Sequence, residues 1–127
     1  LGAGELLVTS IDREGTGKGF DLELTRRIAE TVSIPVIACG GAGQVSDVYD
    51  VAVEGKADAV CLASVLHYNL LKQPRWGEDF SGEGNIEYLK SRRGFSKIQD
   101  APLPEVKEYL LRRGVQCRAA TREGISV

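Results

Sequence analysis

Three short apolar runs recur along the chain, at intervals that leave room for one helix between each pair. They are rich in β-branched residues, have glycine or proline at their borders, and cover residues 5–11, 34–39 and 57–63. Such runs are typical of parallel strands that are buried on both faces. Their centres, near Val8, Ile37 and Cys61, lie about 24 to 29 residues apart, which fits a strand, a loop and a helix. The pattern predicts an α/β fold of three βα units.

The segments between these runs have the spacing and end signals of amphipathic helices. Asp21 is the expected cap of the first helix, and Ser46 or Asp47 is the expected cap of the second. Gly55 is expected to end the second helix. The residues expected to face inward are Leu24, Ile28 and Val32 in the first helix and Val48, Tyr49, Ala52 and Val53 in the second.

The composition and the hydrophobic pattern of the sequence change after Leu71. Residues 72–101 combine glycines, prolines and many charges without strand alternation, so they are expected to form a surface insertion, with room for a short helix over 86–93. A last helix is expected to open at Pro104 and to end at Gly114. Its inward residues would be Val106, Tyr109 and Leu110, and 118–127 would be a loose tail.

Charge and length exclude several classes of partner. The 127 residues carry 16 Lys and Arg against 18 Asp and Glu, so no basic field exists to hold nucleic acid. No apolar run approaches the length of about 18 residues that a membrane span needs, which excludes a membrane partner. The chain does not begin with methionine, which favours a piece of a longer protein.

The cysteines indicate a reducing compartment. Cys39, Cys61 and Cys117 are odd in number and far apart in sequence, which suits reduced thiols in the cytoplasm better than disulfides. Zinc sites need closer pairs, so no metal is expected, and no motif calls for a cofactor. Cys39 and Cys61 lie inside apolar runs, where cysteine usually serves as a small buried hydrophobe.

Polar and glycine-rich residues follow each apolar run. Thr9, Ser10 and Asp12 group at the end of the first, as in barrel enzymes that face a substrate there, although a flexible surface loop remains the alternative. Residues 40–44 are glycine-rich and precede a helix, so they can turn backbone N–H groups toward a phosphate, or simply make a tight turn. A dinucleotide fingerprint is excluded because Ser46 stands where its third glycine belongs.

The third loop strengthens the phosphate hypothesis. Ala63 and Ser64 end the third run, and residues 65–68 are expected to form a short helical turn. His67 is more often a packing residue than an acid–base catalyst in such an apolar turn. Three βα units fit either an open doubly wound sheet or part of an eight-stranded barrel. Paired phosphate loops after successive strands favour the barrel.

These motifs together resemble the cyclase subunit family of imidazole glycerol phosphate synthase, a (βα)8 TIM barrel of histidine biosynthesis. The resemblance is continuous over residues 1 to about 71 and resumes from about 103 to 118. It implies that residues 1–127 are the C-terminal part of one partial TIM barrel, strands six to eight, with the insertion before the last helix. Val8, Ile37 and Cys61 would then share the inward face, which three strands leave without an opposite wall. The motifs that carry it are Gly2-Ala3-Gly4-Glu5, Thr9 to Thr16, Ile34 to Ala38, Gly40 to Gly43, Ala57-Asp58-Ala59 and Ala63 to His67.

The resemblance implies a function. In this family a glutaminase (glutamine amidotransferase) subunit supplies ammonia, and the barrel cyclises a phosphorylated ribulosyl nucleotide to imidazole glycerol phosphate and an aminoimidazole carboxamide ribonucleotide. It also implies that Glu5 stands at the ammonia entrance and that Thr9, Asp12 and Cys39 line the pocket. The residues implied to bind one substrate phosphate are Glu14, Gly15, Gly40, Gly41, Ala63 and Ser64.

The resemblance assigns no catalytic residue to this chain. The family's two catalytic aspartates belong to the first and fifth strands, so the missing N-terminal part of the barrel is an expected partner, and Asp12 is neither of them. Glu14 stands where the family often has aspartate, and Cys39 stands where serine is frequent. Two alternatives stay open: a cyclase-like paralogue in amidino-sugar biosynthesis, which Gly17 to Asp21 and Leu66 to Asn69 favour, and a non-catalytic phosphate-binding partial barrel.

Overall fold

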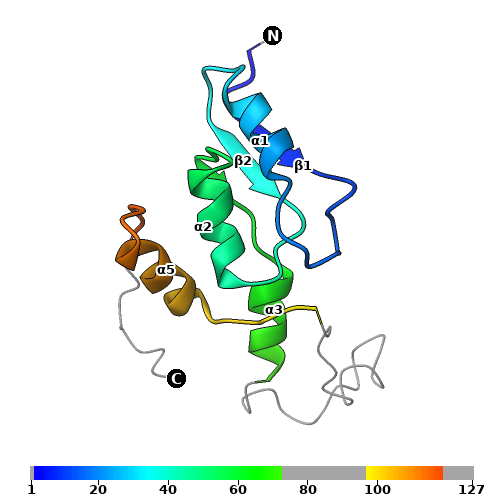
Figure 1. Ribbon diagram of the computed structural model, residues 1–127, viewed down its shortest axis with the longest axis vertical. Helices are drawn as coiled ribbons and strands as arrows, with labels where there is room; N and C mark the ends of the chain where they lie inside the picture. Colours follow the sequence, from blue (N-terminus) through cyan, green and yellow to red (C-terminus); the bar gives the residue numbers. More distant parts are fainter. Residues whose placement is uncertain (1, 73–96, 119–127) are drawn as a thin grey trace.

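The fold is an α/β arrangement around a parallel sheet of three strands. The computed structural model describes residues 2–72 and 97–118, and its strands follow the order β1-β2-β3 (Figure 1). The elements are β1 (Leu6–Thr9), α1 (Leu22–Ala29), β2 (Val36–Cys39), α2 (Val45–Val53), β3 (Ala59–Val60), α3 (Ser64–Leu71) and α5 (Leu103–Arg112). The three predicted βα units are confirmed, although each strand is shorter than its apolar run. The turn expected at 65–68 is a full helix of eight residues.

The register of the sheet decides which side chains face the helices. Leu6 pairs with Val36, and Val8 pairs with Ala38, so these residues share the face that α1 and α2 cover. The opposite face, here named the bare face, has no described helix over it and carries Leu7, Thr9, Ile37, Cys39, Ala59 and Cys61. The expectation that Val8 lies on this face beside Ile37 and Cys61 was wrong. Leu7 takes that place and is 61% exposed.

The core lies between the sheet and its helices. One cluster of buried residues joins α2, α3 and α5, and a second joins β2, α2 and the loop before α1. Val51 on α2 is fully buried, whereas Val53 is 46% exposed, so the prediction that Val53 faces inward was wrong. The first cluster is Val48, Val65, Ala101, Val106 and Leu110, and the second is Phe20, Ala38 and Val51.

The helix ends follow their capping chemistry. The Asp21 carboxylate accepts a hydrogen bond from the Leu24 N–H at 3.0 Å, which confirms the predicted cap of α1. The cap of α2 is Gln44, so the prediction of Ser46 or Asp47 was wrong by two or three positions. Asp47 instead accepts hydrogen bonds from the N–H groups of Gly43 at 2.8 Å and Gln44 at 3.1 Å, from inside the first turn.

The last helix begins one residue earlier than predicted. Pro102 caps α5, and Pro104 lies in its first turn, where a missing N–H costs nothing. Val106 and Leu110 are buried, and Tyr109 is half-buried against the Tyr49 ring, as predicted. Gly114, at φ 81°, follows the helix end in the left-handed region. Among the described residues, no helix has the length and apolar character needed to cross a membrane.

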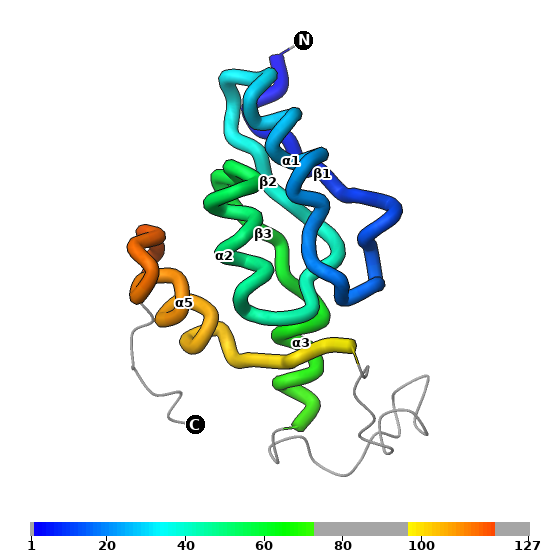
Figure 2. Tube along the Cα trace, viewed as in Figure 1, coloured from blue at the N-terminus to red at the C-terminus, as the bar shows by residue number. Residues whose placement is uncertain are grey.

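The end of the expected insertion belongs to the core. Gln99 donates its N–H to the Gly43 carbonyl at 2.6 Å, and Ala101 donates to the Val65 carbonyl at 3.2 Å. Ala101 is only 2% exposed, and Figure 2 shows this yellow segment running beside α3. The assignment of the whole of 72–101 to the surface was therefore wrong for its last residues. The possible helix over 86–93 lies outside the described residues, as does 119–127 of the expected tail.

An ion pair fastens this segment to α3, and it gives a first prediction. Lys72 pairs with the Asp100 carboxylate, which also accepts a hydrogen bond from the Asn69 amide at 3.2 Å. The hydrogen bond from Lys72 lowers the pKa of Asp100, against desolvation, which raises it. A lowered folded pKa adds stability above the unfolded pKa, near 4, and that stability is lost as the pH falls through the folded pKa.

We therefore expect Asp100→Asn to lower the free energy of unfolding by about 1 kcal/mol at pH 7, and by progressively less as the pH falls below about 4. Urea unfolding at a series of pH values measures this difference. Glu108→Gln is the control, because its ion pair with Arg112 is largely exposed and contributes little. A deficit in Asp100→Asn that stays constant from neutral to acid pH would contradict the assignment to the ion pair.

Candidate functional site

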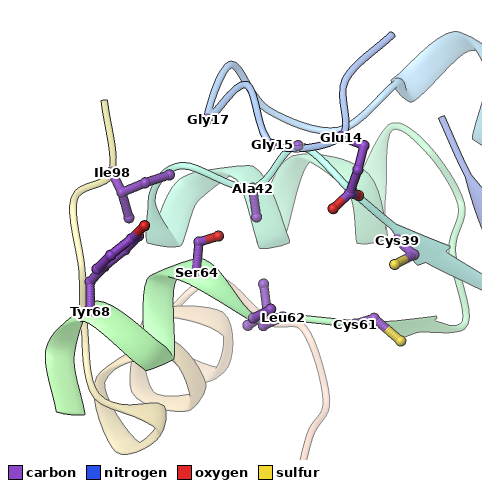
Figure 3. A pocket seen from close by; sticks show the side chains of 13 residues that line it. Glu14, Gly15, Gly17, Cys39, Ala42, Cys61, Leu62, Ser64, Tyr68 and Ile98 are labelled. Carbon is purple, nitrogen blue, oxygen red and sulfur yellow. The ribbon is translucent and has the colours of Figure 1, made fainter. Parts of the chain in front are cut away.

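A cavity of about 290 Å³ opens where the strands end. The loops after β1, β2 and β3 all contribute to its wall, as Figure 3 shows, because the carboxyl ends of parallel strands meet at one edge. A fourth contribution comes from the segment before α5. The lining residues are Glu14, Gly15, Gly17, Cys39, Gly40, Gly41, Ala42, Cys61, Leu62, Ala63, Ser64, Tyr68 and Ile98.

The loop after β1 folds into tight turns that carry Glu14 to the cavity. Glu14 donates its N–H to the Ser10 carbonyl at 2.9 Å, and the Glu14 side chain points into the cavity in Figure 3. The Ser10 hydroxyl is buried and donates to the Asp21 carboxylate at 3.0 Å. The prediction that Ser10 faces a substrate was therefore wrong, because Ser10 connects the strand end to the cap of α1.

The loop after β2 lies against the loop after β1. Gly41 has φ 104° and accepts a hydrogen bond from the Gly19 N–H at 2.8 Å. A Cβ atom at Gly41 would overlap the Gly19 carbonyl oxygen and would stand 2.9 Å from the Arg13 Cβ. Gly40 has φ 89°, and an added Cβ there would meet the Glu14 carboxylate, the end of a flexible side chain. The close approach of the two loops therefore depends mainly on Gly41.

The third wall is the start of α3. Ala63 caps the helix and accepts hydrogen bonds from the N–H groups of Leu66 at 3.1 Å and His67 at 2.9 Å. Ser64 is the first residue of α3, and its side chain lies at the cavity in Figure 3. The positive end of the helix dipole therefore adjoins the cavity. One turn later Tyr68 lines the same wall and faces Ile98.

The lining favours a small polar ligand held by backbone and hydroxyl groups. Glu14 is the single charged residue among the described lining residues, and no Lys or Arg is among them. An anion would therefore be held by glycine N–H groups, the Ser64 hydroxyl and the N-terminus of α3. Glu14 would have to turn its carboxylate away from such an anion.

The structure brings together most of the residues that the sequence indicated. Seven of them surround the cavity: Glu14, Gly15, Cys39, Gly40, Gly41, Ala63 and Ser64. Thr9 and Asp12 are both exposed and are not part of the cavity wall. Glu5 is exposed and precedes β1, at the end of the sheet opposite the cavity.

Six lining residues were not among the predicted site residues: Gly17, Ala42, Cys61, Leu62, Tyr68 and Ile98. Tyr68 stands four positions after Ser64, so a full helix at this point would have placed both on one face. Ile98 had no local signal, because it follows the long segment after α3. His67, by contrast, is exposed, and its ring stacks edge to face on that of Tyr68 with centroids 5.5 Å apart.

The two cysteines at the cavity differ from expectation. Cys61 is exposed and Cys39 is half-buried, so the prediction that both are buried hydrophobes was wrong. Their side chains lie on the bare face, which no described helix covers. Within residues 2–72 and 97–118, no group of three or more His, Cys, Asp or Glu side chains is placed to hold a metal ion.

Comparisons with known proteins agree on one family. The family model described as "Histidine biosynthesis protein" matches residues 1–72. The HisF subunit of imidazole glycerol phosphate synthase from Alkaliphilus metalliredigens is 59% identical over 75 residues, which are 59% of this chain and 30% of that protein. The same subunit from Trichormus variabilis is 64% identical over 70 residues, 55% of this chain and 27% of the relative.

A more distant relative extends the match to the last helix. HisF from Pyrobaculum aerophilum is 43% identical over 118 residues, which are 93% of this chain and 34% of the relative. The chain therefore spans about a third of the length of the curated relatives that it matches. Since the family model covers more than half of the residues, the chain belongs to the histidine biosynthesis protein family.

Proposed function

We propose that this chain supplies one phosphate-binding half of a (βα)8 barrel cyclase, the HisF subunit of imidazole glycerol phosphate synthase. In that reaction, ammonia from a glutaminase subunit reacts with a ribulosyl aminoimidazole carboxamide nucleotide. The products are imidazole glycerol phosphate and an aminoimidazole carboxamide ribonucleotide. A cytoplasmic location is part of the proposal, in keeping with three free cysteines.

The observation that carries the proposal is the cavity at the strand ends. Gly40 and Gly41 follow β2, Ser64 opens α3 beside them, and all three line one space. A phosphate at this position would accept hydrogen bonds from backbone N–H groups and from the Ser64 hydroxyl, with the dipole of α3 favouring its negative charge. The similarity to HisF proteins supports the same assignment.

The exposed side chains of the bare face support the proposal that this chain is part of a barrel. Leu7 and Ile37 point away from the helices, and Leu7 is largely exposed. Strands β1 and β3 are the two edges of the described sheet. Five further strands would pair with these edges and bury the bare face, as closure of an eight-stranded barrel requires. The catalytic acid and base are assigned to those strands, and no residue of this chain takes either role.

Reconstitution tests the proposal. The full chain is mixed with a fragment of the Alkaliphilus metalliredigens HisF relative that holds strands one to five, and ammonia-dependent cyclisation is assayed. We expect activity from the mixture and none from either part. The chain alone is expected to self-associate in light scattering through its bare face, and less so after mixing. A complex that forms but stays inactive would favour the non-catalytic partial barrel.

Glu5 gives a second prediction within this proposal. Glu5 lies at the end of the sheet opposite the cavity, where ammonia from a glutaminase would enter a barrel. With a glutaminase subunit added to the reconstituted barrel, we expect Glu5→Gln to lower glutamine-dependent turnover several-fold while leaving turnover with free ammonia unchanged. Glu105→Gln, on α5, is the control and should change neither rate. Equal changes in both rates for Glu5→Gln would argue against a role in ammonia transfer.

A further inference from the structure

Cys39 and Cys61 are neighbours across two strands. The ladder pairs Ile37 with Ala59 and Ala38 with Val60, and the Cys61 N–H continues it by donating to the Ala38 carbonyl at 2.8 Å. The next pair in this register is Cys39 with Cys61. Figure 3 shows both sulfur atoms at one edge of the cavity.

This arrangement suits a covalent bond between the two sulfur atoms. Adjacent strands lie about 4.8 Å apart, which falls inside the usual range of about 4.4 to 6.8 Å between the Cα atoms of a disulfide. Both side chains leave the sheet on the same face, since paired residues in a parallel ladder point the same way. Closure needs side-chain rotation and also an approach of the two Cβ atoms, from about the strand spacing to within about 4.5 Å. Cys61 stands one residue beyond the end of β3, so this approach shifts a strand end and leaves the paired residues of the sheet in register.

The third thiol is held elsewhere. The Cys117 thiol donates to the Lys107 carbonyl at 3.6 Å and packs against the cluster that joins α2, α3 and α5. That cluster lies on the helix-covered side of the sheet, whereas Cys39 and Cys61 lie on the bare face. Cys61 is exposed, so a small oxidant can reach the pair directly.

We propose that Cys39 and Cys61 form a reversible disulfide under peroxide, a modification site of this chain. One thiolate attacks a peroxide oxygen, which gives a sulfenic acid and, after proton uptake, one water. The second thiol then displaces the hydroxyl group as a second water and closes the S–S bond. In total, the two thiols lose two electrons and two protons, and one peroxide is reduced to two waters. This proposal does not depend on the proposed cyclase function.

The chemistry of the pair adds a pH dependence. Desolvation and the adjacent Cys39 sulfur raise the pKa of the Cys61 thiol above its ordinary value. Since the thiolate is the reactive form, oxidation should accelerate as the pH rises from 7 toward 9. Among the described residues of the cavity wall, Glu14 is the one charged group. Its carboxylate also disfavours a thiolate.

The disulfide would also tie together two walls of the cavity. Cys39 immediately precedes Gly40, and Cys61 is followed by Leu62, Ala63 and Ser64. All of these residues line the same space. Bond formation would therefore fix the start of the loop after β2 to the start of the segment that leads into α3.

Peptide mapping of the full chain tests the site. Reduced protein is treated with one equivalent of hydrogen peroxide, blocked with iodoacetamide and digested with trypsin without reduction. Cleavage after Lys56 separates the two cysteines into peptides 28–56 and 57–72. We expect these two peptides to be joined, with the loss of two hydrogen atoms, and to separate again after dithiothreitol.

Three cysteine variants and a comparison of rates make the result decisive. Cys117→Ser should form the same link, whereas Cys39→Ser and Cys61→Ser should not. At a dilution where light scattering shows single chains, the rate should be at least about 10-fold higher than in urea, where proximity is lost. Links to Cys117, links between chains, oxidation of single cysteines without a link, or an equal rate in urea would each overturn the proposal.

Discussion

Ser64→Asp is expected to raise the Michaelis constant of the reconstituted barrel for its phosphorylated substrate by about 100-fold or more. Ser64 is the first residue of α3 and lines the cavity, so a carboxylate there would face the bound phosphate. Two like charges about 4 Å apart repel by about 4 kcal/mol at an effective dielectric constant near 20, which suffices for this loss.

The same substitution should leave the helix intact. An acidic residue in the first turn of a helix interacts favourably with its dipole, by about 0.3 to 1 kcal/mol. The free energy of unfolding of Ser64→Asp should therefore be unchanged or higher in urea titrations. Ser64→Asn is the matched control, because it has the same shape without the charge, and we expect its Michaelis constant to rise much less. Similar Michaelis constants for both variants would exclude a phosphate beside Ser64.

The sequence was sufficient to predict the three βα units because their signals are local. Apolar runs predicted the strands, and Asp21 predicted the start of α1 through a cap that acts over three residues. The gathering of the loop residues around one cavity was largely predictable for a related reason. Residues that follow parallel strands must gather at one edge of the sheet, which brings Gly15, Gly40 and Ser64 together.

Side-chain orientation was harder to predict from the runs alone. A shift of one residue exchanges the two faces of a strand, and an unbroken apolar run such as 5–11 does not show which face is which. Val8 was therefore assigned to the wrong face, and the exposed position of Leu7 was missed.

Contacts made across long sequence separations could not be predicted. The Gln99 N–H bonds to the Gly43 carbonyl, and Ala101 is buried against α3, although the preceding segment has the composition of a surface loop. Composition averages over a segment, whereas these contacts depend on a few backbone groups. The role of Ile98 in the cavity wall depends on the same docking.

Gly41→Ala is expected to lower the free energy of unfolding of the chain by about 3 kcal/mol, a large fraction of the stability of a small domain. Gly41 has φ 104°, where a side chain is strained. Its added Cβ would also overlap the Gly19 carbonyl oxygen, a backbone atom that cannot rotate away. The hydrogen bond from the Gly19 N–H to the Gly41 carbonyl, 2.8 Å long, would then be lost or distorted.

Gly114→Ala separates the cost of backbone strain from the cost of the overlap with the Gly19 carbonyl oxygen. Gly114 has φ 81°, but nothing lies within 4 Å of its added Cβ, so this variant carries the backbone strain without the overlap. We expect it to cost about 1 kcal/mol, and the excess in Gly41→Ala then measures the contact between the loops after β1 and β2. Urea unfolding of both variants under one set of conditions gives the comparison. Equal losses in the free energy of unfolding at the two positions would mean that the two loops move apart at little cost. The backbone contact between them would then not be a rigid part of the cavity wall.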